Sequence, residues 1–411
     1  MDLSDIRIKE HFGLITNDTN TTQFSFLVSP PKNRETIEKH DTVCFNHPKY
    51  GEACQVLAEV KEITVYEEIA GSTIGERVGK MLASAKIIGY VDLRNKARPF
   101  CKLLAPPNPG SRVYMPYALF LEDILNRGGT NGETYTQPLY LGKTEIVGAS
   151  READDQQVSC YIDAADLSSK HTLICAIDGA GKTHLATVII EELANKTSYP
   201  IVVFDPNNEY YAIGETSKLD ENYHFNFETA IINADPKNSQ DVITKKIRND
   251  QVSVITAENL SLAEKSVYYK NILSVLAESR RQKTTQPFIL VVENAEDLPL
   301  QAIQEVLIAK NGIATILISS HPAMLGARVF SKIGIQIAGR TVDPENLTFL
   351  KSIVEGSDEQ LSSLHVGEWV INGLNVMRPT KVRVRERYSK PKQVDRTSGK
   401  VTLTDNQMNN S

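Results

Sequence analysis

The stretch Ala176-Ile-Asp-Gly-Ala-Gly-Lys-Thr183 decides the fold class of this 411-residue chain. A strand-like run, His171 to Ile177, precedes it, and a helix-like run, His184 to Lys196, follows it. A strand, a glycine-rich loop and a helix in this order are typical of a P-loop, which binds phosphates through backbone N–H groups at a helix N-terminus. The sequence therefore predicts a nucleotide-binding α/β domain.

Each residue type in such a loop has a definite task. Gly181 lets the backbone approach the phosphates, Lys182 reaches the β- and γ-phosphates, and the Thr183 hydroxyl binds Mg²⁺. ATP and Mg²⁺ are therefore the predicted cofactors. The predicted nucleotide-binding residues are Asp178, Gly179, Ala180, Gly181, Lys182, Thr183 and His184.

One P-loop position departs from the usual pattern, because Ala176 stands where glycine is common. Alanine is tolerated there if its φ is negative and strained if its φ is positive. We expect nucleotide binding to survive, with a decayed loop as the alternative. A second Gly-Lys pair, within Gly71–Met81, lacks a following Ser or Thr and predicts only a turn and a helix.

The first part of the chain predicts a small β-rich domain over residues 1–105. Short apolar runs separated by turn residues are typical of a sandwich or a small barrel. A helix over about Gly75 to Ala85 interrupts these runs. Residues 106–155 are predicted to be a connector with a helix at Tyr117–Asn126. The runs are 12–15, 23–28, 42–45, 53–65 and 86–91.

From about residue 156 to residue 387 the pattern changes to apolar runs that alternate with helical stretches. Continuous apolar strands between helices indicate a mainly parallel central sheet covered on both faces. The runs are 172–177, 201–204, 252–256, 288–292, 314–319 and 334–338, and the helices are 185–196, 262–281 and 300–310. Residues 388–411 are polar, and we predict a disordered tail.

Two further strand ends carry acids. Asp205 ends the run Ile201–Phe204, and Glu209 follows in Asp205-Pro-Asn-Asn-Glu209. Alone, this pattern indicates a strand followed by an Asp-Pro turn. One helix after a P-loop, it predicts two acids near the nucleotide, where they help to position water.

The run Phe288–Val292 ends in Glu293 and has the form of a Walker-B strand. Glu293 is predicted to hold Mg²⁺, together with Thr183. The next position usually carries an acid that activates water, but here it is Asn294, whose amide can hold water without accepting its proton. A buried strand capped by solvated acids is the alternative. We expect Glu296 and Asp297 to point elsewhere.

Polar residues also follow the last two strands. Ser319, Ser320 and His321 end one run at the edge where a γ-phosphate sensor would lie, although a structural histidine is the simpler interpretation of His321. Arg340 ends the next run. It is either a surface charge or a group that stabilises transition-state charge on a neighbouring subunit's nucleotide.

The composition restricts the class of protein. The net charge is −6, so no global basic field indicates nucleic acid, although a pore could still carry local basic residues. The five cysteines have no paired spacing, which disfavours disulfides and zinc and favours the cytoplasm. We expect no membrane span, because no apolar run reaches 18 residues.

Together these motifs resemble the archaeal HerA family of HerA/FtsK ATPases. The similarity covers about residues 8–387. The matching stretches are Phe12–Ile15, Thr22–Val28, Asp166–His171, Phe204–Tyr210, Glu293–Glu296, Ile318–Pro322, Gln336–Arg340 and Leu364–Arg387. The resemblance implies a RecA-like P-loop NTPase domain over 156–387, with a shortened helical insertion at 215–285, and a HAS-barrel over 1–105.

The resemblance also implies a function. Members are hexameric rings that hydrolyse ATP to move on double-stranded DNA, and they act with the nuclease NurA in DNA end processing. The implied catalytic residues are Asp205, Glu209, Glu293, Asn294 and Arg340. The departures from the family pattern are Ala176, Asn208, Asn294 and the pair Ser320-His321.

Three hypotheses follow. The first is a homo-hexameric translocase with a NurA-like partner. The second is a nucleotide-binding paralogue without hydrolysis, which serves an assembly or regulatory role or joins a mixed ring with an active paralogue. The third, a small-molecule kinase, is disfavoured because it leaves the N-terminal β domain without a role. The alternating basic residues Lys381, Arg383, Arg385 and Arg387 fit DNA contact and a solvated edge strand equally well.

Overall fold

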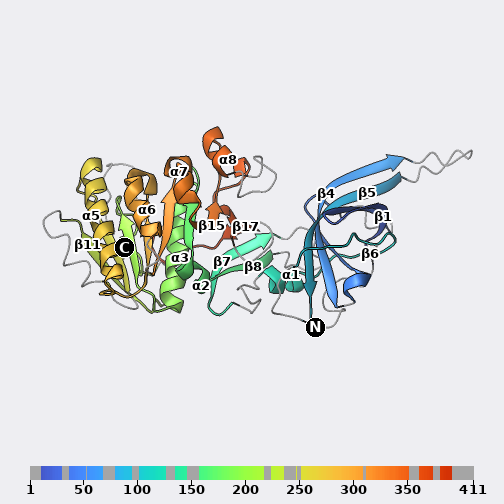
Figure 1. Ribbon diagram of the computed structural model, residues 1–411, viewed down its shortest axis with the longest axis horizontal. Coiled ribbons are helices and arrows are strands. Elements are labelled where there is room, and N and C mark those ends of the chain that lie inside the picture. Colours follow the sequence, from blue (N-terminus) through green and yellow to red (C-terminus); the bar gives the residue numbers. More distant parts are fainter. Residues whose placement is uncertain are drawn as a thin grey trace, which may run out of the picture. The chain divides into compact units, whose positions relative to one another are not determined.

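The computed structural model describes residues 11–29, 37–51, 53–67, 79–94, 101–125, 135–145, 157–216, 224–235, 247, 251–308, 312–350, 361–373 and 380–390 (Figure 1). The chain divides into two compact units. The barrel unit comprises Met1–Asp163 and Val370–Arg383, and the P-loop unit comprises Ala164–Trp369 and Val384–Ser411. The predicted boundaries at 105, 155 and 387 stay predictions.

The barrel unit contains a six-stranded sheet in the order β3-β4-β5-β2-β1-β6. Beyond β6, Tyr114 and Cys44 of β3 exchange two backbone hydrogen bonds of 2.8 Å, which join the two edges of the sheet. The predicted small β-barrel is therefore confirmed. Its strands are β1 (Gly13–Thr19), β2 (Gln23–Val28), β3 (Thr42–Asn46), β4 (Cys54–Glu67), β5 (Gly79–Asp92) and β6 (Arg112–Val113).

The predicted helix over Gly75–Ala85 is wrong where the structure describes it, because residues 79–85 belong to β5. Ala83, Ala85 and Ile87 are buried at alternate positions in the barrel core. Alanine, leucine and methionine favour helices locally, but antiparallel pairing of β5 with both β4 and β2 overrides that preference. Residues 71–78, which hold most of the second Gly-Lys stretch, lie outside the described residues.

The rest of the barrel unit holds one α-helix and a second group of strands in the described part of the chain. Helix α1 (Ala118–Leu125) confirms the helix expected at 117–126 and buries Phe120, Leu121 and Ile124. The strands follow the order β16-β17-β7-β8, and β7 and β8 are antiparallel. Their bounds are β7 (Pro138–Glu145), β8 (Gln157–Asp163), β16 (Glu368–Asn372) and β17 (Thr380–Val384), and a short 3₁₀ helix, η3, spans Pro48–Tyr50.

The P-loop unit is built on parallel strands in the order β11-β12-β10-β13-β14-β9-β15. All six predicted apolar runs are strands of this sheet, so the α/β fold with a mainly parallel sheet is confirmed. Only β11, at one edge, lacked an apolar run in the sequence. The strands are β9 (His171–Cys175), β10 (Ile201–Asp205), β11 (Glu228–Asn233), β12 (Gln251–Thr256), β13 (Phe288–Val292), β14 (Ile313–Ser319) and β15 (Ile333–Ala338).

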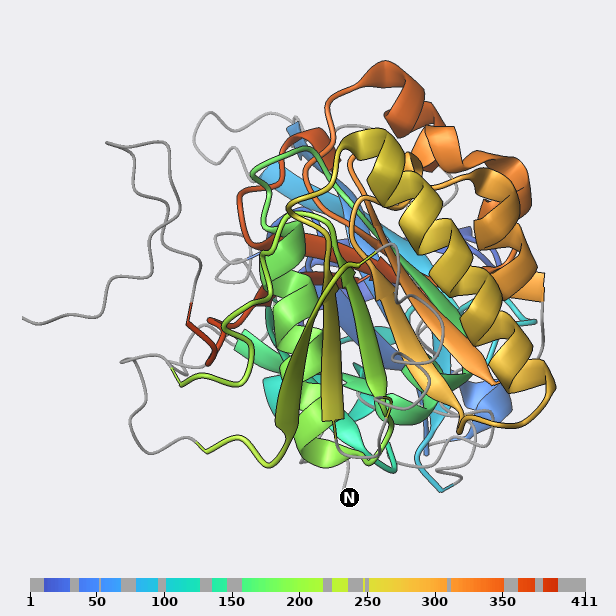
Figure 2. The ribbon, with the colours of Figure 1, turned by 90° about the vertical axis from the view of Figure 1, so that its left-hand side faces the viewer.

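Helices flank this sheet, with α3 and α5 prominent beside the strands (Figure 2). Helix α5 starts with a capping box, in which Ser261 and Glu264 each bond the other's backbone N–H. The bounds are α2 (Ala164–Ser169), α3 (Lys182–Lys196), α5 (Leu262–Arg281), α6 (Leu300–Ile308), α7 (Pro322–Phe330), α8 (Pro344–Leu350) and the 3₁₀ turn η4 (Ala295–Asp297). Among the described helices, none is long and apolar enough to cross a membrane.

Parallel pairing places the carboxyl ends of β10, β13, β14 and β9 along one edge of the sheet. Open α/β sheets bind ligands at this edge. The P-loop follows β9, the acids Glu293 and Asp205 end or follow β13 and β10, and Ser320 follows β14. The fold therefore gathers the sequence motifs at one place.

Candidate nucleotide-binding site

The P-loop joins β9 to α3 and depends on two glycines. Gly179 has a φ of 78° and Gly181, the N-cap of α3, has a φ of 97°. These left-handed conformations strain any residue with a side chain. Ala176 is not among the described non-glycine residues with a positive φ, so alanine there carries no such strain. Its Cβ lies 3.0 Å from the position that a Cβ on Gly339 would take.

Lys182 lies folded against its own loop. Its Nζ donates to the carbonyl oxygens of Ala176 and Ile177, both at 3.2 Å, and to Asp178 Oδ1 at 3.0 Å. Only 8% of Lys182 is exposed, whereas the Asp178 side chain is 87% exposed. The ammonium group is thus held by loop oxygens, which phosphate oxygens could replace with stronger charge-assisted bonds.

Thr183 is the point at which the predicted acids meet. Its hydroxyl lies 2.5 Å from Glu209 Oε2 and 3.1 Å from Glu293 Oε1. Glu209 comes from the loop after β10 and Glu293 from the end of β13, so two distant segments reach the first turn of α3. Tertiary structure therefore brings Glu209 to the Thr183–Glu293 pair that the sequence predicts at the metal.

Asp205 lies one step behind this group. Its side chain is fully buried, and its two carboxylate oxygens accept the backbone N–H groups of Glu209 at 2.9 Å and Tyr210 at 2.8 Å. Burial raises the pKa of Asp205 to about 6, and these amides oppose the rise. Asp205 thus shapes the loop that presents Glu209 and makes no hydrogen bond to Thr183 among the described contacts.

Glu293 is buried and held from two sides. Besides Thr183, the hydroxyl of buried Tyr210 donates to its Oε2 at 2.7 Å. The pKa of Glu293 is raised to about 7, chiefly by burial and also by the nearby charge of Glu209, while the hydrogen bonds from Tyr210 and Thr183 oppose the shift. A carboxyl group that titrates near neutral pH is typical of functional sites.

Asn294 follows in the left-handed conformation, with φ 52° and ψ 54°, as the N-cap of η4. Asparagine tolerates this conformation better than most residues, because its short polar side chain hydrogen-bonds locally. Asn208, where the motif resemblance predicts glycine, has a φ of 54°, and its Nδ2 donates to Glu258 at 3.1 Å. The backbone thus accounts for asparagine at both positions.

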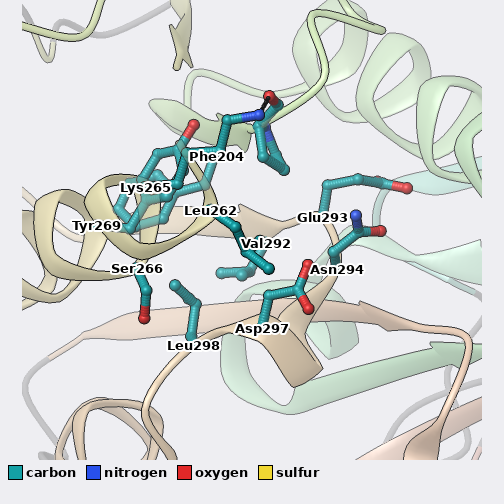
Figure 3. Close-up of a pocket in the computed structure, with 11 residues that line it drawn as sticks. Phe204, Leu262, Lys265, Ser266, Tyr269, Val292, Glu293, Asn294, Asp297 and Leu298 are labelled. Carbon is teal, nitrogen blue, oxygen red and sulfur yellow. Dashed lines mark hydrogen bonds between the residues drawn. The ribbon is translucent and has the colours of Figure 1, made fainter. Parts of the chain in front are cut away.

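A small pocket lies beside Glu293 and Asn294 (Figure 3). Its walls come from β10, β13, η4 and α5, and they include Phe204, Leu262 and Tyr269. Lys265 bridges one side by donating to the carbonyl of Pro206 at 2.7 Å. The lining is mostly apolar, which suits packing better than phosphate binding.

Glu296 does not point away from the site, contrary to expectation. Its Oε1 accepts the backbone N–H groups of Ser320 at 2.8 Å and His321 at 3.3 Å, at the end of β14. The Ser320 hydroxyl in turn donates to Asp178 Oδ1 in the P-loop. These bonds with Ser320 and Lys182 lower the pKa of Asp178. Asp297, the neighbouring acid, is exposed.

Two predicted site residues, Arg340 and His184, make no side-chain hydrogen bond to Thr183 among the described contacts. Arg340 has an exposed side chain, and its carbonyl accepts the N–H of Ile177, so its backbone abuts the P-loop. The imidazole of His184 hydrogen-bonds through Nε2 to the carbonyl oxygen of Arg385 at 2.9 Å. The part of His184 that faces the loop is thus its backbone in the first turn of α3.

The C-terminal basic segment has a structural role that the sequence left open. Arg385 lies beyond the end of β17 and pairs with Glu191 at 3.1 Å and Glu192 at 2.9 Å, both on α3. All three side chains are less than one-tenth exposed. Glu191 also accepts the N–H of Ser389 at 2.7 Å, so residues 388–389, expected in the tail, are anchored on α3. Residues 391–411 lie outside the described residues.

Two residues of this site were not predicted as site residues from the sequence. Tyr210 and Glu296 stood within the matched motifs Phe204–Tyr210 and Glu293–Glu296, and that membership was the only available signal. The bond from Tyr210 to Glu293 spans 83 positions of the chain, so local pattern could not reveal it.

The donor set at Thr183 fits Mg²⁺, because it combines one hydroxyl with two carboxylates and no nitrogen or sulfur. Within the described residues, no three His, Cys, Asp or Glu side chains cluster closely enough to hold a metal by themselves. Mg²⁺ at nucleotide sites takes its other ligands from phosphate and water, so one or two protein oxygens suffice.

Comparison with known proteins agrees with these motifs. Residues 147–298 match the family model described as "Helicase HerA, central domain". A "Probable DNA double-strand break repair helicase HerA" from Methanocaldococcus jannaschii is 28% identical over 199 residues, which are 48% of this chain and 32% of that protein. The resemblance drawn from the motifs is therefore confirmed. The chain spans about a quarter to a third of the length of the curated relatives it matches.

Solved structures show distant similarity. VirB4 of Thermoanaerobacter pseudethanolicus is 13% identical with a TM-score of 0.43, over 61% of this chain and 97% of that one. The genome packaging NTPase B204 from Sulfolobus turreted icosahedral virus 2, solved with AMPPCP, is 15% identical with a TM-score of 0.38, over 53% of this chain and 99% of that one.

Proposed function

We propose that this chain, a HerA-type protein over its central domain, binds Mg²⁺-ATP and acts as a subunit of a ring motor that moves on double-stranded DNA. The observation that carries the proposal is the meeting of Glu209 and Glu293 at the Thr183 hydroxyl, directly after the P-loop lysine. This arrangement supports binding of a triphosphate and its metal at one edge of the sheet.

The residues divide the work as follows. Lys182 exchanges its loop oxygens for the β- and γ-phosphate oxygens, and the backbone N–H groups from Gly179 to His184 bind the remaining phosphate oxygens. Thr183 and Glu293 would hold Mg²⁺, which when bound neutralises charge on the phosphates. Glu209, fixed by Asp205, orients water near the γ-phosphate.

Arg340 completes the proposed site from a neighbouring subunit. Arg340 lies two residues after the end of β15, and its exposed side chain is accessible to another chain's nucleotide. A trans-acting arginine that stabilises transition-state charge requires a ring, so we propose a homo-hexamer or a mixed ring with a paralogue. Loss of turnover in Arg340→Ala, with nucleotide affinity unchanged, would support this role.

Double-stranded DNA and a NurA-like nuclease in DNA end processing are the proposed partners, on the strength of the HerA-type central domain. The net charge of −6 confines any DNA contact to a local surface. Arg385 is not available for it, because both of its terminal nitrogens pair with buried glutamates. The five free cysteines favour a reducing cytoplasm.

The test is an ATPase assay with and without duplex DNA, on the wild type and on Lys182→Ala. The motor predicts hydrolysis that DNA stimulates and that Lys182→Ala abolishes. Light scattering after size exclusion tests the ring. Absence of turnover with DNA and with a nuclease partner, despite ATP binding, would remove the motor function.

A second function is favoured by one observation, the amide of Asn294 at the position where an acid normally activates water. In this case ATP binding stabilises a ring, and the chain serves an assembly or regulatory role without hydrolysis. Mixing with an active paralogue would then restore turnover that this chain lacks by itself.

A further inference from the structure

Glu296 links the turn after β13 to the turn after β14. From η4, its Oε1 accepts the backbone N–H of Ser320 at 2.8 Å and that of His321 at 3.3 Å. Its Oε2 is buried without a hydrogen-bond partner among the described residues. One carboxylate oxygen therefore fixes the backbone at which β14 gives way to α7.

The same turn reaches the P-loop through a side chain. The Ser320 hydroxyl donates to Asp178 Oδ1, and that oxygen also accepts Lys182 Nζ at 3.0 Å. A continuous chain of polar contacts thus runs from Glu296 through Ser320 and Asp178 to the phosphate-binding lysine. The backbone supports it, because Ala176 N–H lies 3.4 Å from the carbonyl of Ser319.

This chain of contacts lies between the P-loop and Glu293. Strand β14 lies between β9, which leads to the P-loop, and β13, which leads to Glu293. When Lys182 moves to phosphate oxygens, it leaves Asp178 Oδ1. The Asp178 carboxylate, which is also the partner of the Ser320 hydroxyl, then loses the positive charge beside it. The Ser320 hydroxyl, which lies between the P-loop and Glu293, can then form a hydrogen bond to the γ-phosphate, provided that the backbone of Ser320 stays fixed.

We propose that Glu296 is the positioning residue that holds the Ser320–His321 turn in place so that Ser320 distinguishes a bound triphosphate from a diphosphate. The inference rests on the proposed nucleotide binding and adds a residue to that site. Position 294 lacks an acid, whereas Glu296, two residues later, is an acid that accepts backbone N–H groups.

A structural role for Glu296 is the competing explanation, since it also binds the backbone N–H of His321, the N-cap residue of α7. A structural contact affects the stability of the fold, whereas a positioning role affects the ratio of the affinities for triphosphate and diphosphate. The conservative variant Glu296→Gln separates charge from geometry, because its amide oxygen still accepts both N–H groups.

The experiment is calorimetric titration of a non-hydrolysable ATP analogue and of ADP, each with Mg²⁺, into the full chain. Glu296→Ala should reduce the preference for the ATP analogue about tenfold, the scale of one charge-assisted hydrogen bond, and leave ADP affinity within about twofold. Ser320→Ala should cause a similar loss, and Glu296→Gln should keep most of the preference. Asp297→Ala, the exposed neighbouring acid, is the matched control and should bind like the wild type.

Each other outcome has a defined meaning. A wild type that binds no nucleotide removes the proposed function itself. A wild type that binds both nucleotides equally, or a Glu296→Ala variant with unchanged preference, overturns the inference and leaves the nucleotide site standing. An equal loss in Asp297→Ala overturns it too. If circular dichroism shows Glu296→Ala unfolded, Ser320→Ala decides, and its unchanged preference counts against the inference.

Discussion

The loop that binds phosphate and the turn that follows β13 differ in how far they keep the expected chemistry. In the loop, Gly181, Lys182 and Thr183 are all present, and Thr183 is already bonded to Glu209 and Glu293. In the turn, Glu293 is present but Asn294 stands where an acid is usual. For the proposed function, the contrast separates the residues predicted to bind ATP from the position predicted to activate water, within one site.

Backbone conformation explains part of this contrast. Gly181 and Asn294 both have a positive φ, at 97° and 52°. In the loop no side chain fits without strain, whereas in the turn asparagine is tolerated and a longer acid costs about 1–2 kcal/mol. Asparagine at position 294 therefore lacks a base but adopts this backbone conformation with less strain than an acid of glutamate's length.

The largest expected effect tests the turn. Asn294→Glu should raise DNA-stimulated turnover by about 10²–10⁴-fold, because it restores a group that accepts a proton from water. Steady-state phosphate release measures it. Asn294→Gln is the control, because glutamine has the length of glutamate but cannot act as a base, and it should give no rise in turnover. Unchanged turnover in Asn294→Glu would place the catalytic acid elsewhere.

The next effect tests the loop. Lys182→Ala should weaken ATP binding about a hundredfold, the scale of truncating one partner of a buried charged contact. Calorimetric titration with Mg²⁺-ATP measures the affinity. Lys332, an exposed lysine in the turn directly before β15, supplies the control variant Lys332→Ala. Equal affinities for both variants would mean that the loop does not hold phosphate.

A smaller effect concerns Glu293, which both regions share. Because burial raises its pKa to about 7, the carboxyl is mostly protonated at pH 6 and then holds Mg²⁺ poorly. Affinity for Mg²⁺-ATP should fall about tenfold from pH 8 to pH 6, since one pH unit below the pKa leaves about a tenth of the group charged.

Glu293→Gln is the control for this pH effect and should bind Mg²⁺-ATP weakly, with an affinity that does not change between pH 6 and pH 8.

The free energy of unfolding of the ligand-free protein should depend on pH in the opposite direction. A carboxyl whose folded pKa is raised contributes stability below its ordinary pKa of 4.5, and this contribution is lost as the pH rises through 7. An affinity that rises toward pH 6 in the wild type would contradict the assignment.

The smallest effect concerns Asn208, the other left-handed asparagine. Asn208→Ala should lower the free energy of unfolding by about 1 kcal/mol, because alanine tolerates a positive φ less well than asparagine and loses the hydrogen bond from Asn208 Nδ2 to Glu258 at 3.1 Å. Asn208→Gly should stay within about 0.5 kcal/mol of the wild type. Urea denaturation measures both. Equal stability of the alanine variant would show that this backbone is unstrained.

Much of the fold was predictable from local pattern. The six apolar runs became strands of the P-loop unit, and the helix 262–281 was found at its true limits, because its capping box and apolar face are local signals. Strand β5 was mistaken for a helix over 79–85, since its alternating buried alanines have meaning only when paired with β4 and β2. Edge strand β11 lacked a continuous apolar run and was missed.

The sequence by itself determined that the chain has a P-loop, with glycines where φ must be positive and a lysine and a threonine at the required spacing. These features are local, so a few consecutive residues specify them. Only the tertiary structure decided which distant groups meet there. In the folded chain Tyr210 donates to Glu293, and Glu296 accepts a backbone N–H from the turn after β14. Arg385 forms a buried ion pair with α3. The order of parallel strands sets these contacts, and no short stretch of sequence encodes that order.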